Sequence, residues 1–152
     1  MIAIASDHAG FNLKSEIMKH LTEKGMPYDD FGVCDCTTSV DYNDYGVFVA
    51  EAVSKGTHEK GIIICGTGIG ISISANKVPG IRAALCTNSY MAKMSREHND
   101  ANVLALGGRV IGSGLAADIV DTWLSTAFLG GRHQRRVDKF TEIEKKYLIK
   151  NT

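Results

Sequence analysis

Short apolar runs alternate along the chain with longer segments in which apolar residues recur every three or four positions. The runs lie near residues 2–5, 28–31, 62–65, 82–86 and 103–106. The run at 62–65, Ile-Ile-Ile-Cys, is apolar without a break, which is typical of a strand buried on both faces of a parallel sheet. Because strands alternate with helices over short connections, the pattern predicts one three-layer, Rossmann-like α/β domain over residues 1–152, with a five-stranded parallel sheet and helices on both faces.

Helical spacing accounts for most of the remaining apolar residues. It predicts helices over about 13–21, 45–53, 90–96 and 115–124, and another that follows the glycine-rich segment and ends near 78–80. A long charged helix closes the chain, with Val137, Phe140, Ile143 and Tyr147 on one face. The order of the strands does not follow from this pattern.

Charge and composition exclude several classes of protein. The chain has 17 basic and 17 acidic residues, so we expect no nucleic-acid or membrane partner. No apolar run approaches the roughly 20 residues of a membrane span, and residues 1–4 open as a strand rather than as a signal peptide. We therefore expect a cytoplasmic protein, in which cysteines are thiols by default. Cys34 and Cys36 are too close together for the usual zinc pair, and no metal is expected.

The segment after the 62–65 strand carries the strongest chemical signal. Cys65 ends the strand, and Gly66, Gly68 and Gly70 follow in alternation. This spacing is not the dinucleotide pattern G-x-G-x-x-G, and no acidic residue ends the next strand, so binding of NAD is not favoured. Ligands bind at the carboxyl ends of strands in such sheets, where backbone donors can favour a thiolate at Cys65. The alternative is a small buried cysteine beside a tight turn.

Other polar residues follow strand ends or lie in polar segments. Asp7 and His8 follow the first strand, and Arg109 follows the last. His98 lies in a stretch too polar to be core, and a histidine there can transfer protons near neutral pH or be only a solvated loop residue. Arg132 and Arg136 are four apart, so at the start of a helix they form either a phosphate clamp or a solvated basic patch.

These motifs together resemble those of the type B ribose-5-phosphate isomerases, within the wider family that includes galactose-6-phosphate and allose-6-phosphate isomerases. The resemblance covers nearly the whole chain up to about residue 139. The motifs that carry it are Ser-Asp-His-Ala-Gly at 6–10, Ile-Cys-Gly-Thr-Gly-Ile-Gly at 64–70, Ala-Asn-Lys at 75–77, Arg-Ala-Ala at 82–84, Arg-Glu-His-Asn-Asp-Ala-Asn at 96–102 and Gly-Arg-His-Gln-Arg-Arg at 131–136.

The resemblance implies an aldose–ketose isomerase that acts on a phosphorylated sugar through a cis-enediolate, without metal or organic cofactor. It implies that Cys65 is the base and that His98 opens the sugar ring. Relatives with a carboxylate base carry it a few residues into the following helix, where this chain has Ser72, Ile73 and Ser74. Thr67 and the backbone amides of the glycine loop, which comprises Gly66, Gly68, Ile69 and Gly70, would then hold the enediolate oxygen.

The remaining site residues also follow from the resemblance. Sugar hydroxyls are expected at Asp7 and Asn99, and Tyr42 would border the sugar. The phosphate would be bound by His8, Arg109, Arg132 and Arg136. The family's homodimers share each site between subunits, so we expect a homodimer or a dimer of dimers, with the C-terminal helix at about 137–150 packing on the partner.

The first hypothesis is isomerisation of ribose 5-phosphate to ribulose 5-phosphate. Allose 6-phosphate or galactose 6-phosphate is the alternative substrate, because the sequence does not show the length of the pocket. Two other classes stay open: a sugar-phosphate binder without turnover, and a nucleotide-dependent oxidoreductase suggested by the α/β pattern alone.

Overall fold

The computed structural model describes residues 1–148 of the chain, and within them it confirms the predicted α/β fold class. The parallel sheet has the order β2-β1-β3-β5-β4. Its strands are β1 (Ile2–Ser6), β2 (Tyr28–Asp30), β3 (Lys60–Cys65), β4 (Ala83–Leu85) and β5 (Val103–Gly107). The helices are α1 (Phe11–Glu23), α2 (Tyr42–Ser54), α3 (Ile69–Ala75), α4 (Ser89–Glu97), α5 (Ser113–Ser125) and α6 (Arg132–Leu148).

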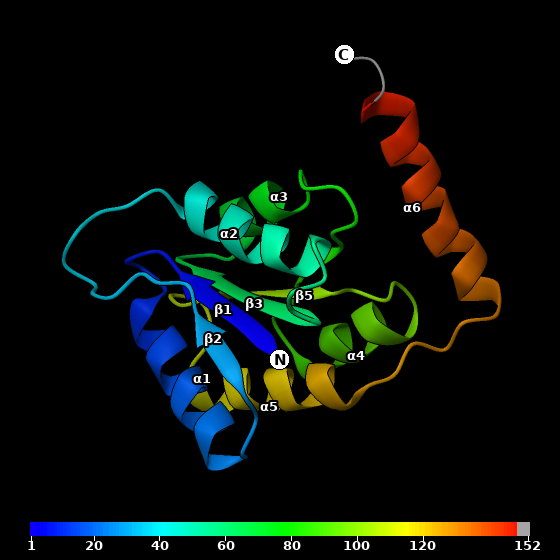
Figure 1. Cartoon of the computed structure of the whole chain (residues 1–152). Coiled ribbons are helices and arrows are strands. Elements are labelled where there is room, and N and C mark those ends of the chain that lie inside the picture. Colours follow the sequence, from blue (N-terminus) through cyan, green and yellow to red (C-terminus); the bar gives the residue numbers. More distant parts are fainter. Residues whose placement is uncertain (149–152) are drawn as a thin grey trace.

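The helices cover the sheet from both sides, and each side has its own core (Figure 1). On one side α2 and α3 pack on the sheet, with Val49 and Ile71 fully buried. On the other side α1, α4 and α5 supply residues such as Ile17 and Trp123 to a second core. α6 extends away from the sheet (Figure 1). No helix within residues 1–148 is long and apolar enough to cross a membrane.

The strand order determines where a ligand can bind. The chain runs from β1 outward to β2 and then returns to β3 on the other side of β1, so the winding reverses between β1 and β3. Open α/β sheets bind ligands at the carboxyl ends of the strands at such a reversal. Ser6 pairs with Ile64, and Cys65 pairs with Gly107. The ends of β1, β3 and β5 therefore lie side by side, with β3 in the middle.

Two helix boundaries differ from those that periodicity predicts. α3 ends at Ala75, because the Asn76 amide turns aside to accept from the Ala83 N–H at 2.8 Å and to donate to the Ala83 carbonyl at 2.9 Å. α6 already begins at Arg132, directly after Gly130 and Gly131, whose φ angles are 63° and 54°. The last residues of the predicted helix, 149–150, lie outside the described residues.

Some apolar residues on predicted helix faces are exposed. Phe48 on α2 and Leu115 on α5 lie at the edges of otherwise buried faces, where the sheet does not reach them. Of the four apolar residues predicted on one face of α6, Val137 is buried, while Phe140, Ile143 and Tyr147 are exposed. The apolar face of α6 therefore has little to pack against within residues 1–148.

Candidate active site

The first group of predicted site residues lies at the carboxyl ends of β1, β3 and β5, and we call it the strand-end group. It consists of Asp7, His8, Cys65, Thr67 and Arg109. Asp7 is buried, and its carboxylate accepts from the Gly10 N–H at 2.9 Å, just before α1. The Nδ1 atom of His8 accepts from the Val40 N–H at 3.2 Å. That acceptor role leaves the proton of the neutral ring on Nε2, where it can serve as a donor.

Cys65 is in direct contact with the loop that follows it. Its side chain is buried, and Sγ accepts a hydrogen bond from the Gly68 N–H at 3.2 Å. The exposed Thr67 lies between them in the chain, and its Oγ1 accepts from the Ile69 N–H at 3.2 Å. The sulfur is thus an acceptor held against one backbone donor, the Gly68 N–H, at the end of the central strand.

Cys86 shows what a purely structural cysteine looks like in the same fold. It follows β4 at the edge of the sheet and is 1% exposed. Burial raises the pKa of its thiol to about 11, an effect that a hydrogen bond with Ser95 only partly offsets. Cys86 is therefore protonated and inert near neutral pH.

Glycine is required at two loop positions by the geometry. Gly68 has a φ of 79°, and a Cβ there would lie 2.5 Å from Leu85 Cδ1 and 2.9 Å from the Leu106 carbonyl carbon. A Cβ on Gly70 would lie 2.5 Å from the ring of Tyr42. The structure therefore places Tyr42, at the start of α2, against the glycine loop beside the strand-end group.

Arg109 reaches the same loop from β5. Its N–H donates to the Gly66 carbonyl at 2.9 Å, and the Gly108 N–H donates to the Cys65 carbonyl at 2.8 Å. A Cβ built on Gly66 would lie 3.7 Å from both Cδ and Nη1 of Arg109. The guanidinium thus lies over the loop, where it can receive an anion.

The second group of candidate residues lies where α4 ends and α6 begins, and we call it the helix-end group. It consists of His98, Asn99, Arg132, His133 and Arg136. The rings of His98 and His133 stack with their centroids 4.2 Å apart and an angle of 10° between planes. The Leu129 N–H donates to the Glu97 carbonyl at 3.2 Å, which ties the approach to α6 to the end of α4.

His133 is a residue of this group that sequence reasoning missed. It is 5% exposed, and its Nδ1 atom has no hydrogen-bond partner within the described part of the chain. Burial lowers its pKa, and the charges of His98, Arg132 and Arg136 act in the same direction. His133 lies within a basic run of the sequence. Its stack on His98 depends on how α6 packs beside α4, and no sequence pattern predicts that packing.

The two groups lie at opposite ends of the sheet. His98 and Asn99 precede the first residue of β5, Val103, whereas Cys65 pairs with its last residue, Gly107. At about 3.3 Å per residue, this strand alone separates them by about 13 Å. Figure 1 shows the same division, with α4 and α6 at the end of the sheet away from the loop between β2 and α2. One chain therefore does not bring all predicted residues together.

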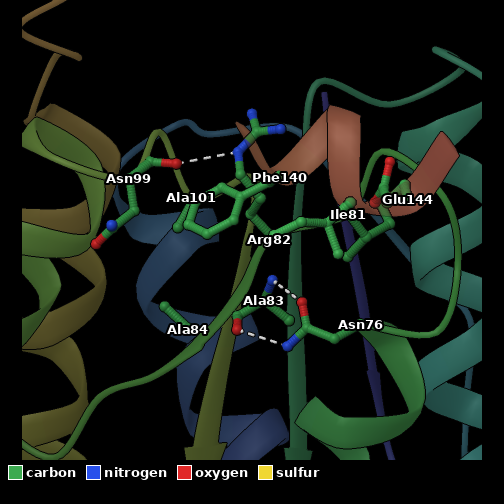
Figure 2. Close-up of a pocket in the computed structure, with 10 residues that line it drawn as sticks. Asn76, Ile81, Arg82, Ala83, Ala84, Asn99, Ala101, Phe140 and Glu144 are labelled. Carbon is green, nitrogen blue, oxygen red and sulfur yellow. Dashed lines mark hydrogen bonds between the residues drawn. The ribbon is translucent and has the colours of Figure 1, made fainter. Parts of the chain in front are cut away.

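A cavity lies on the side of the helix-end group. It has a volume of about 370 Å³ and opens between α6 and the segments that flank β4. Figure 2 shows Phe140 and Glu144 of α6 on one side of it and Asn76, Arg82 and Asn99 on the others. Cys65 does not line this cavity, which is instead bordered by the exposed apolar face of α6.

Fold and site together define a class: an α/β protein with a thiol and basic side chains gathered at the ends of its central strands, where proteins of this architecture bind small ligands. The family model for "Ribose/Galactose Isomerase" matches residues 2–140. This chain therefore belongs to the ribose/galactose isomerase family and is an isomerase, so the predicted resemblance is confirmed and the oxidoreductase alternative is removed.

Individual relatives agree with this assignment. Ribose-5-phosphate isomerase B of Escherichia coli is 52% identical over 95% of this chain and 97% of its own. The structure of Clostridium thermocellum ribose-5-phosphate isomerase B matches with a TM-score of 0.94 and 65% identity over 96% of this chain and 98% of that one. The enzyme from Mycoplasma genitalium, solved with bound ribulose-5-phosphate, matches with a TM-score of 0.91 and 43% identity over 95% and 96%.

Proposed function

We propose that this chain interconverts ribose 5-phosphate and ribulose 5-phosphate through a cis-enediolate, with Cys65 as the base. The observation that carries the proposal is the position of Cys65 Sγ, which accepts from the Gly68 N–H at the end of the central strand. The ribulose-5-phosphate bound to the Mycoplasma genitalium relative supports the choice of substrate.

The proton transfers follow from this placement. In the open-chain aldose, the Cys65 thiolate removes the proton from C2 and the aldehyde oxygen becomes the enediolate oxygen. The same thiol then returns the proton to C1, while a hydroxyl proton passes from the C2 oxygen to the C1 oxygen. Thr67 and the amides of the glycine loop lie at the carboxyl end of β3, next to Cys65, where they would stabilise the developing negative charge.

The phosphate would be held by cationic groups from both ends of the sheet. His8 and Arg109 belong to the strand-end group, and Arg132 and Arg136 lie on the first turns of α6. Because the two groups are separated within one chain, they can act on one substrate only if a second copy brings its helix-end group to the first copy's Cys65. Asp7 and Asn99 would contact sugar hydroxyls in the same composite site, and His98 would open the ring.

We therefore propose a homodimer in which each site is shared between subunits. Exposed apolar side chains lie at both regions that would meet: Tyr42, Ile69, Ile73 and Val110 near the glycine loop, and Phe140, Ile143 and Tyr147 on α6. In a two-fold dimer, α6 of each subunit can cover the apolar residues near the glycine loop of its partner, so the same contact forms twice. A dimer of dimers is the alternative assembly, and the mass of the particle in solution distinguishes the two.

The enzyme is proposed to act in the cytoplasm. Cys34, Cys36, Cys65 and Cys86 are all free thiols in the structure, and the first two are exposed. Free exposed thiols are typical of a reducing compartment.

The test is a side-by-side measurement of kcat/KM on ribose 5-phosphate, allose 6-phosphate and galactose 6-phosphate. The proposal predicts the highest value for the pentose phosphate. A preference for either hexose phosphate would assign the chain to the other branch of its family. Binding of all three without turnover would make it a sugar-phosphate binder and refute catalysis.

A further inference from the structure

The turn that carries His98 and Asn99 has an unusual backbone. Asp100 has a φ of 46°, and within residues 1–148 no other non-glycine residue has a positive φ. Such a conformation costs free energy unless the surroundings hold it. Here the N–H of Asp100 donates to the Arg96 carbonyl at 3.2 Å, and the N–H of Ala101 donates to the Ser95 carbonyl at 2.9 Å.

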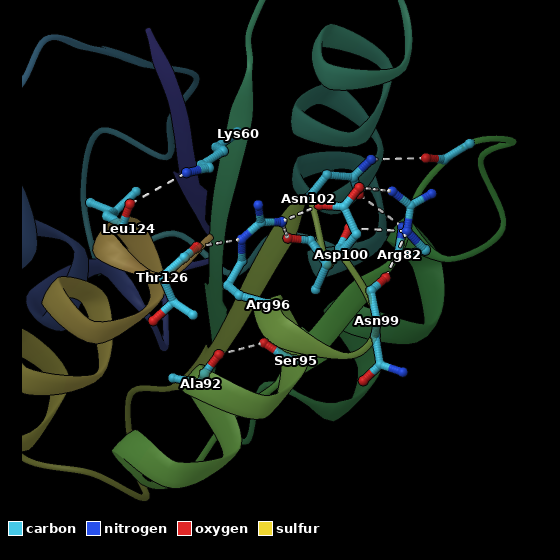
Figure 3. Close-up of polar contacts among 12 residues, drawn as sticks. Lys60, Arg82, Ala92, Ser95, Arg96, Asn99, Asp100, Asn102, Leu124 and Thr126 are labelled. Carbon is cyan, nitrogen blue, oxygen red and sulfur yellow. Dashed lines mark hydrogen bonds and ion pairs between the residues drawn. The ribbon is translucent and has the colours of Figure 1, made fainter. Parts of the chain in front are cut away.

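Two arginines from different elements hold this turn from opposite sides (Figure 3). Arg96, near the end of α4, donates to Asp100 Oδ1 at 2.9 Å and to the Ala101 carbonyl at 2.6 Å. Arg82, just before β4, donates from Nη2 to Asp100 Oδ2 at 3.2 Å. The Nε of Arg82 also donates to the carbonyls of Asn99 and Asp100, both at 3.0 Å.

The arginines are themselves fixed by the core. Arg96 is 8% exposed, with its guanidinium carbon 5.7 Å from the centre of the Trp123 ring. The backbone N–H of Arg82 donates to Asn102 Oδ1 at 2.8 Å, at the start of β5. The Asp100 carboxylate thus links the end of α4 to the start of β4 through two cations. Charge-assisted bonds of this kind are shorter and stronger than neutral ones.

We propose that Asp100, clamped between Arg82 and Arg96, is a positioning residue that fixes His98 and Asn99 for the reaction on the sugar. This inference rests on the proposed function. None of the three clamp residues belongs to the strand-end or helix-end group. Their contacts converge on the backbone that immediately follows His98, so loosening the clamp displaces His98 and Asn99 first. Arg132 and Arg136 lie on a separate helix that is joined to this turn through the His98–His133 stack and the Leu129 N–H, so they are displaced less.

The test uses Asp100→Asn, because asparagine, like aspartate, tolerates a positive φ better than most other non-glycine residues but carries no charge. We expect kcat for ribose 5-phosphate to fall about 10-fold, since a small displacement of a group that acts on the substrate has effects of this order. The inhibition constant for inorganic phosphate should stay unchanged, because the phosphate-binding arginines lie elsewhere. Arg82→Lys, which loses the fork that reaches both carbonyls, should act in the same direction.

Asp121→Asn is the matched control. The Asp121 side chain is 33% exposed against 34% for Asp100, and it also pairs with two basic side chains, Lys24 and His20. It lies on α5, away from both groups, so its removal should leave kcat within about twofold. If Asp100→Asn behaves like Asp121→Asn, or if kcat, KM and phosphate inhibition all worsen together with the unfolding temperature, the positioning role is wrong.

A double-mutant cycle shows whether Asp100 acts through the histidine. Asp100→Asn made in a His98→Ala background should reduce kcat by clearly less than about 10-fold further, because the proton-transferring group that it positions is gone and only the contact of Asn99 with the sugar is left to disturb. A second full 10-fold loss would contradict the inference. Wild-type chain without isomerase activity would instead refute the proposed function. In that event, amide hydrogen exchange still tests the clamp, since Asp100→Asn should speed exchange at the N–H groups of residues 100 and 101.

Discussion

The strand-end group and the helix-end group are built in opposite ways. Cys65, Asp7 and His8 are held by hydrogen bonds from backbone N–H groups of their own chain, at the end of a buried sheet. Arg132 and Arg136 instead stand exposed on α6, whose apolar face is also mostly uncovered. Under the proposed homodimer, this difference would divide the site between subunits: the fold of one chain would form one half, and α6 of a second copy would supply the other.

Replacement of the base should have the largest effect. Cys65→Ala removes the group that we propose moves the proton between C1 and C2, so kcat should fall by roughly 10²-fold or more. Inhibition by free phosphate should persist, because the phosphate-binding side chains are untouched. The measurement is steady-state turnover of ribose 5-phosphate with phosphate as inhibitor.

Cys86→Ala serves as its control, since Cys86 is equally buried but lies at the edge of the sheet with a pKa of about 11. This variant should turn over like the wild type after correction for any loss of folded protein. Undiminished turnover by Cys65→Ala would remove the proposed mechanism.

Mixing two inactive variants tests the division between chains directly. Cys65→Ala and His98→Ala should each inactivate both sites of their own dimer. The first removes a residue of the strand-end group and the second a residue of the helix-end group. If subunits exchange at random, half the dimers are mixed and each has one intact composite site, so activity should return to about a quarter of the wild-type value. Refolding the two variants together and assaying ribose 5-phosphate turnover measures this.

The control is each variant refolded alone and then combined without exchange. If every site lay within one chain, mixed dimers would contain one damaged residue in each site and no activity would return. Absence of recovery, with mixed dimers demonstrated by mass, would therefore show that the two groups do not meet across an interface.

The arginines of α6 should have a smaller effect that falls on binding. Arg136→Ala should raise KM for ribose 5-phosphate and the inhibition constant of phosphate about 10-fold each, because a charge-assisted phosphate contact is lost. kcat should change less. Arg135→Ala is the control, since Arg135 is the adjacent exposed arginine but does not share the face of Arg132 and Arg136. If both substitutions raised KM and the inhibition constant equally, Arg136 would act only as a general surface charge and not as a specific phosphate contact.

The sequence predicts the strand-end half of this picture well, for a physical reason. An unbroken Ile run before Cys65 requires a buried parallel strand, and such strands bring their carboxyl ends to one edge. The α/β class and the contact between sulfur and loop follow from these local rules. Strand order does not, because it depends on which strands pair across the sheet.

The helix-end half is harder to predict from the sequence. The stack of His98 on His133 and the clamp on Asp100 join residues far apart in the chain or on different elements, and neither shows a periodic signal. The apolar face predicts the last helix only from about residue 137, whereas α6 begins at Arg132, because a polar run that follows two glycines has no apolar face to mark it. The amphipathic pattern of α6 would be the same whether its apolar face packed on its own domain or on a partner, so the sequence does not distinguish the two.

The smallest expected effect tests the internal support of the strand-end group. Lys14 of α1 is 1% exposed, and its Nζ donates to Asp30 at 2.6 Å and to the Val33 carbonyl at 2.8 Å. This contact fixes the start of the segment whose Val40 N–H donates to His8. Lys14→Met should lower the free energy of unfolding by about 2 kcal/mol. That is less than for a fully buried pair, because the Asp30 side chain is 32% exposed.

Lys24→Met is the matched substitution at the surface, where Lys24 pairs with Asp121 and both side chains are at least 33% exposed. Its loss should lie within about 0.5 kcal/mol. Urea unfolding at equal protein concentration compares the two, since the stability of a dimer depends on concentration. Equal losses for both substitutions would mean that the strand-end group does not depend on buried contacts of its own chain, and the contrast with the helix-end group would fail.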